Sequence, residues 1–456
     1  MLQKNAGYFE QKGCEERSSK KEKALKRQQE AAAAAALAAA SIEEADPLSG
    51  NYGEWPKWTE IGLVNESLKN KPVLVRGRIH TNRPVGKNIG FLVLREEGFT
   101  IQCVLTVAEN LISRQMAKFA TSLSKESIVD IQGIVSVPDA PIKGATQQVE
   151  LQVRKIYAIC KAVPTLPLNI VDATRSEADI EKALQDGGQI VRVNQDTRLN
   201  FRVLDMRTPA NLAIFRIQSH VEDIFREFLK SQGFFGIHTP KLIEGTSEGG
   251  ASVFELDYFG TPACLAQSPQ LYKQMAICGD FRRIFEIGSV FRAEKSSTPR
   301  HVCEFIGLDV EMEFKEDYSE VMDVVDGLFV AMFDSLNKNC QKELEAIGKQ
   351  YPFEPLKYLR ETPRLTFEER VQMLKEAGVE VESLGDLNIE MERKLGKLSH
   401  GIDLKSIESY IDAFRYATHP HGGFGVGLER IVMLFCGLKN IRKTSLFPHD
   451  PQRITP

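Results

Sequence analysis

Charged and aromatic residues with the potential for chemistry gather in residues 285–314, FEIGSVFRAEKSSTPRHVCEFIGLDVEMEF. Their period of two predicts a hairpin, in which two strands are joined by a basic loop. Apolar residues share one face of each strand. Arg292, Glu294, Phe305 and Asp309 share the other face, which we expect to be open. The alternative is a solvated sheet face, on which Arg292 only neutralises nearby acids.

A second candidate is the Gly-rich run HGGFGVGLER, residues 421–430, which leads into an apolar helix with Arg430 in its first turn. It lacks the third glycine of GxGxxG, and the chain contains no GxxxxGK[ST] motif. A bound nucleotide would therefore need Arg292 and Arg430 to hold its phosphates on an antiparallel sheet, because arginine forms bidentate bonds with phosphate.

Short polar clusters occur in residues 247–255 and 265–274, where glycine and proline predict loops. They are either ordinary loops or part of a binding site. Their candidate side chains are Ser247, Glu248, Ser268, Gln270 and Lys273.

Composition indicates a globular protein of two or three domains, with 456 residues, 42% hydrophobic and 26% charged. A net charge of −4 gives no global nucleic-acid signal, so RNA contacts would need local basic patches. The eight cysteines form no CxxC pair, which favours free thiols in a reducing compartment. Without a membrane-spanning run or signal peptide, we expect a cytoplasmic protein with no membrane partner.

The chain divides into four parts. Residues 1–50 form a basic, Ala-rich N-terminal extension. Residues 60–162 contain five strand patterns with a helix after the third, which predicts an OB-fold barrel. Residues 163–200 resemble a hinge with a short helix, and residues 201–456 hold the hairpin and most helices. The predicted fold class is α+β: a barrel followed by an antiparallel β-sheet flanked by helices.

Three ordered motifs resemble those of class II aminoacyl-tRNA synthetases: GFFGIHTPKL, the FRAE…GLDVEM hairpin, and GFGVGLER. The segment QSPQLYKQ is similar to that of the aspartyl-tRNA synthetases of eukaryotes and archaea. The resemblance covers residues 70 to 456. It implies ATP-dependent activation of L-aspartate to aspartyl-adenylate, followed by transfer to tRNA(Asp), with ATP and Mg²⁺ as cofactors.

The same resemblance implies roles for individual residues. The catalytic arginines would be Arg292 and Arg430. ATP would be bound by Arg292, Glu294, His301, Phe305 and Arg430. Aspartate would be bound by Ser247, Glu248, Ser268, Gln270, Lys273 and Asp309. The anticodon would be read by Arg83, Phe91, Gln102 and Glu150 on the barrel, although Phe91 has a core position as its alternative. Pro240 would lie at a homodimer interface.

One segment of the family pattern is missing near residues 398–399, where MERKLGKL runs directly into SHGIDLKSIESYIDAF. Relatives place there the strands that carry the magnesium-binding acids and an arginine for the substrate carboxylate, so the metal ligands appear absent. Relatives also carry Arg in place of His449. The alternatives are therefore a catalytically impaired splice or gene-model variant, a noncatalytic tRNA-binding paralogue, or an asparaginyl-tRNA synthetase. The sequence specifies no partner in a multi-synthetase complex.

Overall fold

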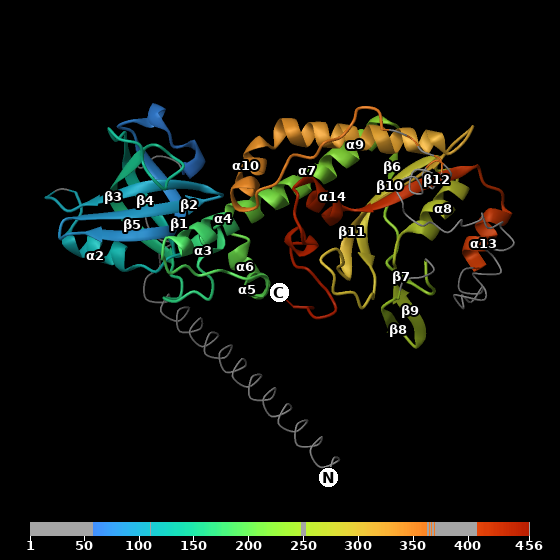
Figure 1. The fold of residues 1–456 in the computed structure, drawn as a ribbon, viewed down its shortest axis with the longest axis horizontal. Helices are drawn as coiled ribbons and strands as arrows, with labels where there is room; N and C mark the ends of the chain where they lie inside the picture. The colour runs from blue at the N-terminus through green and yellow to red at the C-terminus, as the bar shows by residue number, and fades with distance from the viewer. Residues whose placement is uncertain are drawn as a thin grey trace, which may run out of the picture. The chain divides into compact units, whose positions relative to one another are not determined.

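The computed structural model describes residues 58–109, 111–247, 252–362, 364, 366, 369 and 408–455. The N-terminal extension, Glu248 and the junction near residues 398–399 lie outside these ranges. The chain forms two compact units, Met1–Pro167 and Leu168–Pro456, which are considered separately (Figure 1). No helix within the described ranges is both long enough and apolar enough to cross a membrane.

The first unit is a closed five-stranded barrel with strand order β1-β2-β3-β5-β4. Alternate residues point inward, so that Leu92, Leu94 and Cys103 are fully buried in its core. The predicted OB-type barrel and the helix after its third strand are confirmed. The elements are η1 (Ile61–Leu63), η2 (Glu66–Leu68), β1 (Pro72–Val85), β2 (Ile89–Glu96), β3 (Phe99–Thr106), α2 (Arg114–Ser122), β4 (Ile128–Ser136) and β5 (Glu150–Cys160).

Four short helices open the second unit: α3 (Ile170–Ala173), α4 (Glu177–Gln185), α5 (Gln195–Asn200) and α6 (Arg202–Asp205). Ser176 begins α4 with a capping box, in which its side chain and that of Asp179 satisfy each other's backbone N–H groups. The carbonyl of Ala173 accepts hydrogen bonds from Arg198 and Gln350, at 2.7 and 2.9 Å. These helices are thus bonded to distant parts of the same unit. The hinge itself stays a prediction.

The main sheet of the second unit has the order β12-β11-β10-β6. β10 pairs antiparallel with β11, β11 antiparallel with β12, and β6 parallel with β10. The hairpin of residues 285–314 is therefore confirmed as its centre. The strands are β6 (Phe235–Gly236), β10 (Arg283–Phe291), β11 (Glu304–Glu313) and β12 (His421–Gly427), and a smaller sheet joins β7 (Leu242–Ile243), β9 (Thr261–Leu265) and β8 (Glu255–Tyr258).

Helices cover both faces of the main sheet (Figure 1). On one face, Phe285, Leu308 and Val310 pack in a single core with apolar residues of α7, α9, α10 and α14. On the other face, α8 packs against β10 and β11, and α13 packs against α8. The helices are α7 (Pro209–Ser231), α8 (Gln270–Cys278), α9 (Ser319–Asn339), α10 (Gln341–Gln350), α13 (Glu408–Arg415), α14 (Leu428–Phe435) and η4 (Ile441–Lys443).

Two expectations about the hairpin and its surroundings are wrong. The middle of the face expected to be open is covered, because Glu286, Asp309 and Glu311 are 2%, 7% and 1% exposed. The solvated-face alternative fails for the same reason. Nearer the loop, Arg292, Glu294 and Phe305 are half-buried. Gln270 and Lys273, expected in a loop, lie on α8, because Pro269 marks the start of a helix there.

Candidate active site

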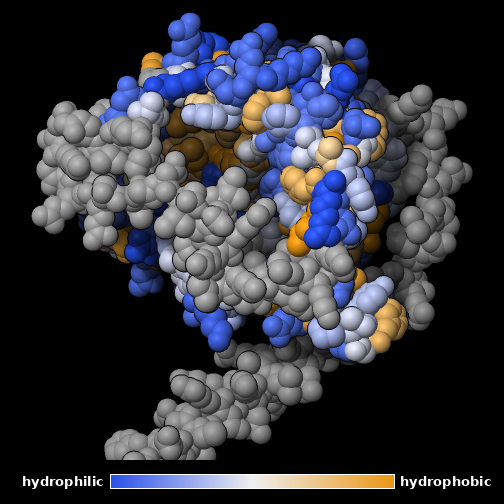
Figure 2. Space-filling model, turned by 90° about the vertical axis from the view of Figure 1, so that its right-hand side faces the viewer, coloured by the Kyte–Doolittle hydropathy of each residue, from blue (hydrophilic) through white to orange (hydrophobic). Residues whose placement is uncertain are grey.

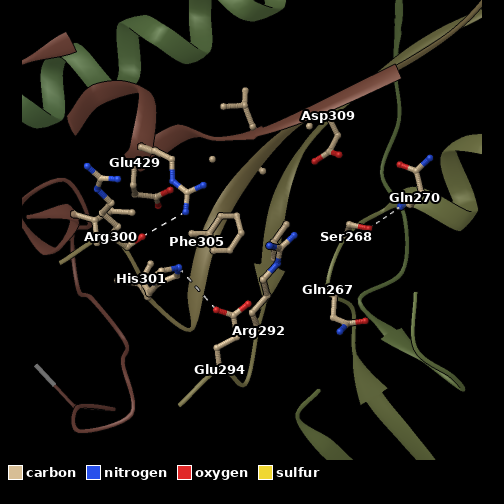
Figure 3. A pocket seen from close by; sticks show the side chains of 18 residues that line it. Gln267, Ser268, Gln270, Arg292, Glu294, Arg300, His301, Phe305, Asp309 and Glu429 are labelled. Atoms are coloured by element: carbon tan, nitrogen blue, oxygen red, sulfur yellow. Dashed lines mark hydrogen bonds and ion pairs between the residues drawn. The ribbon is translucent and has the colours of Figure 1, made fainter. Parts of the chain in front are cut away.

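A cavity of about 400 Å³ lies where β10, β11 and β12 meet the loop that joins β10 to β11 and the start of α14 (Figure 3). Arg292 follows β10, Phe305 and Asp309 lie on β11, and Arg430 lies in the first turn of α14. Long-range strand pairing thus unites the two motifs. The predicted site residues that line the cavity are Ser268, Gln270, Arg292, Glu294, His301, Phe305, Asp309 and Arg430.

An aromatic platform forms the middle of the cavity. The guanidinium carbon of Arg292 lies 5.7 Å from the centroid of the Phe305 ring, and Figure 3 shows the two side chains next to each other. A flat heterocycle between such groups gains stacking and cation–π energy. The glycines of residues 421–430 leave room beside these side chains. A Cβ on Gly427 would lie 3.4 Å from Phe305, and one on Gly425 would lie only 2.6 Å from Asp309 Oδ1.

Three arginines, Arg292, Arg300 and Arg430, give the cavity its positive charge. Arg430 is exposed, and its Nη2 donates to the carbonyl oxygen of Arg300 at 3.4 Å. His301 Nε2 lies 4.0 Å from Glu294 Oε2. Guanidinium groups in fixed positions suit an oligophosphate, because they neutralise its charge without rearranging. The sequence reasoning did not single out Arg300, although its place in the basic loop was a signal.

Glu429 was also missed. It lines the cavity next to Arg430, is 4% exposed, and its Oε2 accepts from the backbone N–H of Ile306 at 3.1 Å. Burial raises its pKa to about 7, although hydrogen bonds from backbone N–H groups oppose the shift. Glu429 therefore connects α14 to β11 and titrates near neutral pH. The only sequence signal was its position inside GLER.

Lys273 lies beneath the cavity rather than in its wall. It is 1% exposed, and its Nζ lies 3.1 Å from Asp309 Oδ1 and 3.6 Å from Glu311 Oε2. Burial raises the pKa of both carboxyl groups, and the nearby lysine opposes that shift. Two acids around one lysine carry a net negative charge unless one of them binds a proton. Asp309 also lines the cavity, so a ligand there could contact this buried group through the Asp309 carboxylate.

A smaller hollow of about 130 Å³ adjoins these residues and is lined by Ser247, Ser268, Tyr272 and Tyr410, among others. Ser268 lines both this hollow and the larger cavity. The Ser247 hydroxyl is buried and has no hydrogen-bond partner among the described residues. A buried hydroxyl of this kind is a free donor for a polar ligand group.

The four residues predicted to read the anticodon lie on neighbouring strands of the barrel. Arg83 pairs with Phe91 across β1 and β2, and its guanidinium carbon lies 5.4 Å from the Phe91 ring centroid. Gln102 of β3 donates to Glu150 of β5 at 2.6 Å. Phe91 is not part of the barrel core, since its neighbour Leu92 points inward instead. The core alternative for Phe91 is therefore wrong.

Comparisons with known proteins agree with this architecture. The family described as tRNA synthetases class II (D, K and N) matches residues 194–403 and 390–451, and the OB-fold nucleic acid binding domain matches residues 73–159. Aspartate–tRNA ligase 2, cytoplasmic, of Arabidopsis thaliana is 52% identical over 503 residues, covering 91% of this chain and 90% of the relative.

Solved structures of tRNA synthetases also resemble this one. An aspartyl-tRNA synthetase of Entamoeba histolytica has a TM-score of 0.76 at 39% identity, over 88% of this chain and 93% of its own. An asparaginyl-tRNA synthetase of Pyrococcus horikoshii, complexed with asparaginyl-adenylate, has a TM-score of 0.70 at 27% identity, over 88% of this chain and 100% of its own.

The length of the alignment with the Arabidopsis relative is consistent with a missing segment. Ninety-one per cent of 456 residues is about 415, which is 88 fewer than the 503 aligned positions. The family match is divided between residues 390 and 403, around the junction identified in the sequence. The 52% identity over 91% of the chain, together with the family match, shows that the chain belongs to the class II aspartyl-tRNA synthetases.

Proposed function

We propose that this chain is an aspartate–tRNA ligase, which activates L-aspartate with ATP and transfers it to tRNA(Asp). The observation that carries the proposal is the cavity that brings Arg292, Phe305 and Arg430 together on an antiparallel sheet. The carboxylate of aspartate attacks the α-phosphorus of ATP, pyrophosphate leaves, and a hydroxyl at the 3′ end of the tRNA then displaces AMP from the adenylate.

ATP would occupy the cavity with its adenine on Phe305 and its phosphates beside Arg292 and Arg430. Glu294 would accept from the adenine edge, and His301 would lie beside the phosphates. Phosphoryl transfer needs little covalent help from the protein, so fixed arginines supply most of what the reaction requires. Arg300, the third arginine of the cavity, adds to this charge.

Aspartate would lie between the ATP site and the smaller hollow. Its amino group suits Asp309, which belongs to the net-negative group around Lys273. Ser247, Ser268 and Gln270 would bond to its polar ends, and Glu248 is proposed from its sequence position alone. For Lys273 to hold the side-chain carboxylate, Asp309 or Glu311 must bind a proton or turn away. The substrate carboxylate would thus compete with Asp309 and Glu311 for Lys273. In relatives an arginine from the segment that is missing here also binds that carboxylate, so in this chain Lys273 would have to bind it alone.

Magnesium was predicted as a second cofactor of the reaction. Within the part of the chain that the structure describes, no group of three or more His, Cys, Asp or Glu residues could hold a metal ion. Magnesium that accompanies ATP needs only one or two protein carboxylates besides phosphates and water, so the ion stays a prediction, and no step of the mechanism above depends on it.

The barrel would bind the anticodon. Phe91 offers a ring for base stacking, with Arg83 beside it, and Gln102 and Glu150 offer donors and acceptors for base edges. A homodimer is proposed from an apolar patch near Pro240: Phe235 and Phe281 are 59% and 46% exposed, and their ring centroids lie 5.7 Å apart. We also propose a cytoplasmic location, as for the Arabidopsis relative.

The decisive experiment is aspartate-dependent ATP–pyrophosphate exchange, with asparagine as the control amino acid. We expect exchange with aspartate and none with asparagine. Exchange with asparagine instead would identify an asparaginyl-tRNA synthetase. A matched chimera would carry the 88 extra aligned positions of the Arabidopsis relative at the junction near residues 398–399.

A second candidate function is tRNA binding without catalysis, and the missing positions favour it. In that case this chain would bind tRNA through its barrel but show no exchange, whereas the chimera would show both. Activity in both proteins would establish that the segment is dispensable. Absence of tRNA binding by the folded chain would contradict both candidates.

A further inference from the structure

The C-terminal segment, residues 441–450, runs beside the loop of residues 292–304 that faces the cavity. Two backbone hydrogen bonds join them: Ile441 N–H donates to the Pro299 carbonyl at 2.8 Å, and Cys303 N–H donates to the His449 carbonyl at 2.7 Å. His449 Nδ1 also lies 2.8 Å from Glu304 Oε2. The loop is thus held in its middle, at Pro299, and at its C-terminal end, at Cys303 and Glu304, by residues more than a hundred positions away.

The same C-terminal segment contains a buried ion pair, formed by the residues that follow the two attachments, Arg442 and Asp450. Arg442 Nε donates to Asp450 Oδ2 at 2.6 Å, and the side chains are 10% and 8% exposed. The backbone N–H of Gln452 donates to the other carboxylate oxygen at 2.8 Å. Burial opposes ionisation of Asp450, but these hydrogen bonds prevail and its pKa is lowered, so the pair is charged at neutral pH.

The same guanidinium also reaches the loop. Arg442 Nη1 donates to the carbonyl oxygen of Thr298 at 3.1 Å. Arginine can do this because its planar fork presents Nε to one acceptor and Nη1 to another at the same time. A lysine has a single ammonium group, which could pair with Asp450 without keeping the bond to Thr298.

Thr298 in turn contacts the residues that face the cavity. Its hydroxyl is hydrogen-bonded to His301 Nδ1 and accepts from the backbone N–H of Arg300 at 3.3 Å. Arg300 and His301 both line the cavity, whereas Arg442 and Asp450 do not. A continuous series of contacts therefore runs from Asp450 through Arg442 and Thr298 to the backbone of Arg300 and the imidazole of His301.

We propose that Arg442 is a positioning residue, which fixes the 292–304 loop so that Arg300 and His301 face ATP before ATP binds. The inference rests on the proposed function, because ATP is the ligand proposed for the cavity. A loop that is already ordered binds its ligand more tightly, since less conformational entropy is lost on binding. Without the bond from Arg442, ATP would have to order the loop itself.

Limited proteolysis of the full chain tests this directly, because Lys295 and Arg300 are trypsin sites inside the loop. The variant Arg442→Lys keeps the charge beside Asp450 but not the bond to Thr298. The matched control is Arg453→Lys, which lies three residues beyond the segment and donates to Asn200 rather than to the loop. Mass spectrometry would measure cleavage at the two loop sites relative to cleavage elsewhere.

We expect Arg442→Lys to raise loop cleavage about tenfold, the change expected from loss of one hydrogen bond to a charged group. Arg453→Lys should stay within about twofold of wild type. The Kd for ATP should rise by a similar factor in Arg442→Lys, while the Kd for aspartate stays unchanged, a split that a general loss of stability would not produce.

Wild-type loop cleavage in Arg442→Lys, or an equal increase in both variants, would overturn the inference. If Arg442→Lys proves unstable at the assay temperature, Asp450→Asn decides instead, because it leaves Arg442 in place and removes the anion that orients it. Failure of ATP to slow loop cleavage in wild type would count against the proposed function, whereas the comparison of variants without ATP would still test Arg442.

Discussion

The barrel and the main sheet bury charge in different ways. In the barrel, Arg95 Nη2 lies 2.7 Å from Glu126 Oε2, and both side chains are almost completely buried, so an arginine meets an acid. In the sheet, Lys273 faces the two carboxylates of Asp309 and Glu311. A balanced pair suits a structural role, because its charges cancel. An unbalanced group can bind a proton or a cationic ligand group, which suits a site.

The two units also place their candidate functional residues differently. Phe91 and Gln102 lie on the outside of a barrel whose interior is apolar, so they can change without disturbing the core. Asp309 and Glu429 are buried between β-strands and helices, so they contribute to both binding and stability. Substitutions on the barrel surface should therefore change tRNA binding without changing stability. Substitutions in the sheet should often change both ligand binding and stability.

The largest expected effect is on catalysis. Arg292→Ala should lower aspartate-dependent ATP–pyrophosphate exchange by about a thousandfold, because removing one preorganised charge from a transition state typically costs that much. Affinity for tRNA should change only a few-fold, since the barrel binds the anticodon. The control is Arg283→Ala, at the start of the strand that Arg292 follows, which donates to the Gln232 carbonyl instead. A large loss of tRNA binding in Arg292→Ala would contradict the proposal that the cavity catalyses activation while the barrel binds tRNA.

The second-largest effect is expected at Lys273, which faces the carboxylates of Asp309 and Glu311. Lys273→Met should lower the free energy of unfolding at pH 7 by about 4 kcal/mol, because it leaves two buried acids without their cation. The loss should be smaller at pH 5, where Asp309 and Glu311 more readily bind protons. Urea unfolding at both pH values measures this, with exposed Lys342→Met as the control, expected within about 0.5 kcal/mol of wild type. Equal losses at both pH values would show that charge is not the cause.

Glu429 should make the second unit less stable as pH rises. Its folded pKa of about 7 exceeds the ordinary 4.5, so the folded state holds its proton more tightly. That contribution is full below pH 4.5 and is lost as pH rises towards 7, for a total of about 3 kcal/mol. Glu429→Gln should therefore flatten this part of the pH dependence of unfolding. An unchanged pH dependence in the variant would assign the slope to other groups.

The smallest effect is expected in the barrel. Phe91→Ala should weaken tRNA binding about tenfold, as expected for loss of one stacked base, and should leave ATP–pyrophosphate exchange unchanged. Filter binding or fluorescence titration would measure the affinity. Val93→Ala is the matched control, because this aliphatic residue is also partly exposed on β2. If both variants bind tRNA like wild type, base stacking on this face of the barrel is excluded.

Much of the fold followed from local patterns in the sequence. Period-two alternation located the barrel strands and the hairpin of β10 and β11. Glycine and proline were less reliable, since Pro269 begins the helix that carries Gln270 and Lys273. The motifs also identified Arg292, Phe305 and Arg430, because their order along the chain is characteristic of the family.

The sequence by itself therefore determined the barrel strands and the hairpin of β10 and β11, and it named candidate residues for ATP, because periodicity and motifs are local. Only the tertiary structure decided that α8 covers the hairpin and places Lys273 between two acids, that Glu429 is buried near Ile306, and that Arg442 reaches Thr298. These contacts join residues 36 to 144 positions apart. No local pattern encodes them, since they depend on how whole elements pack.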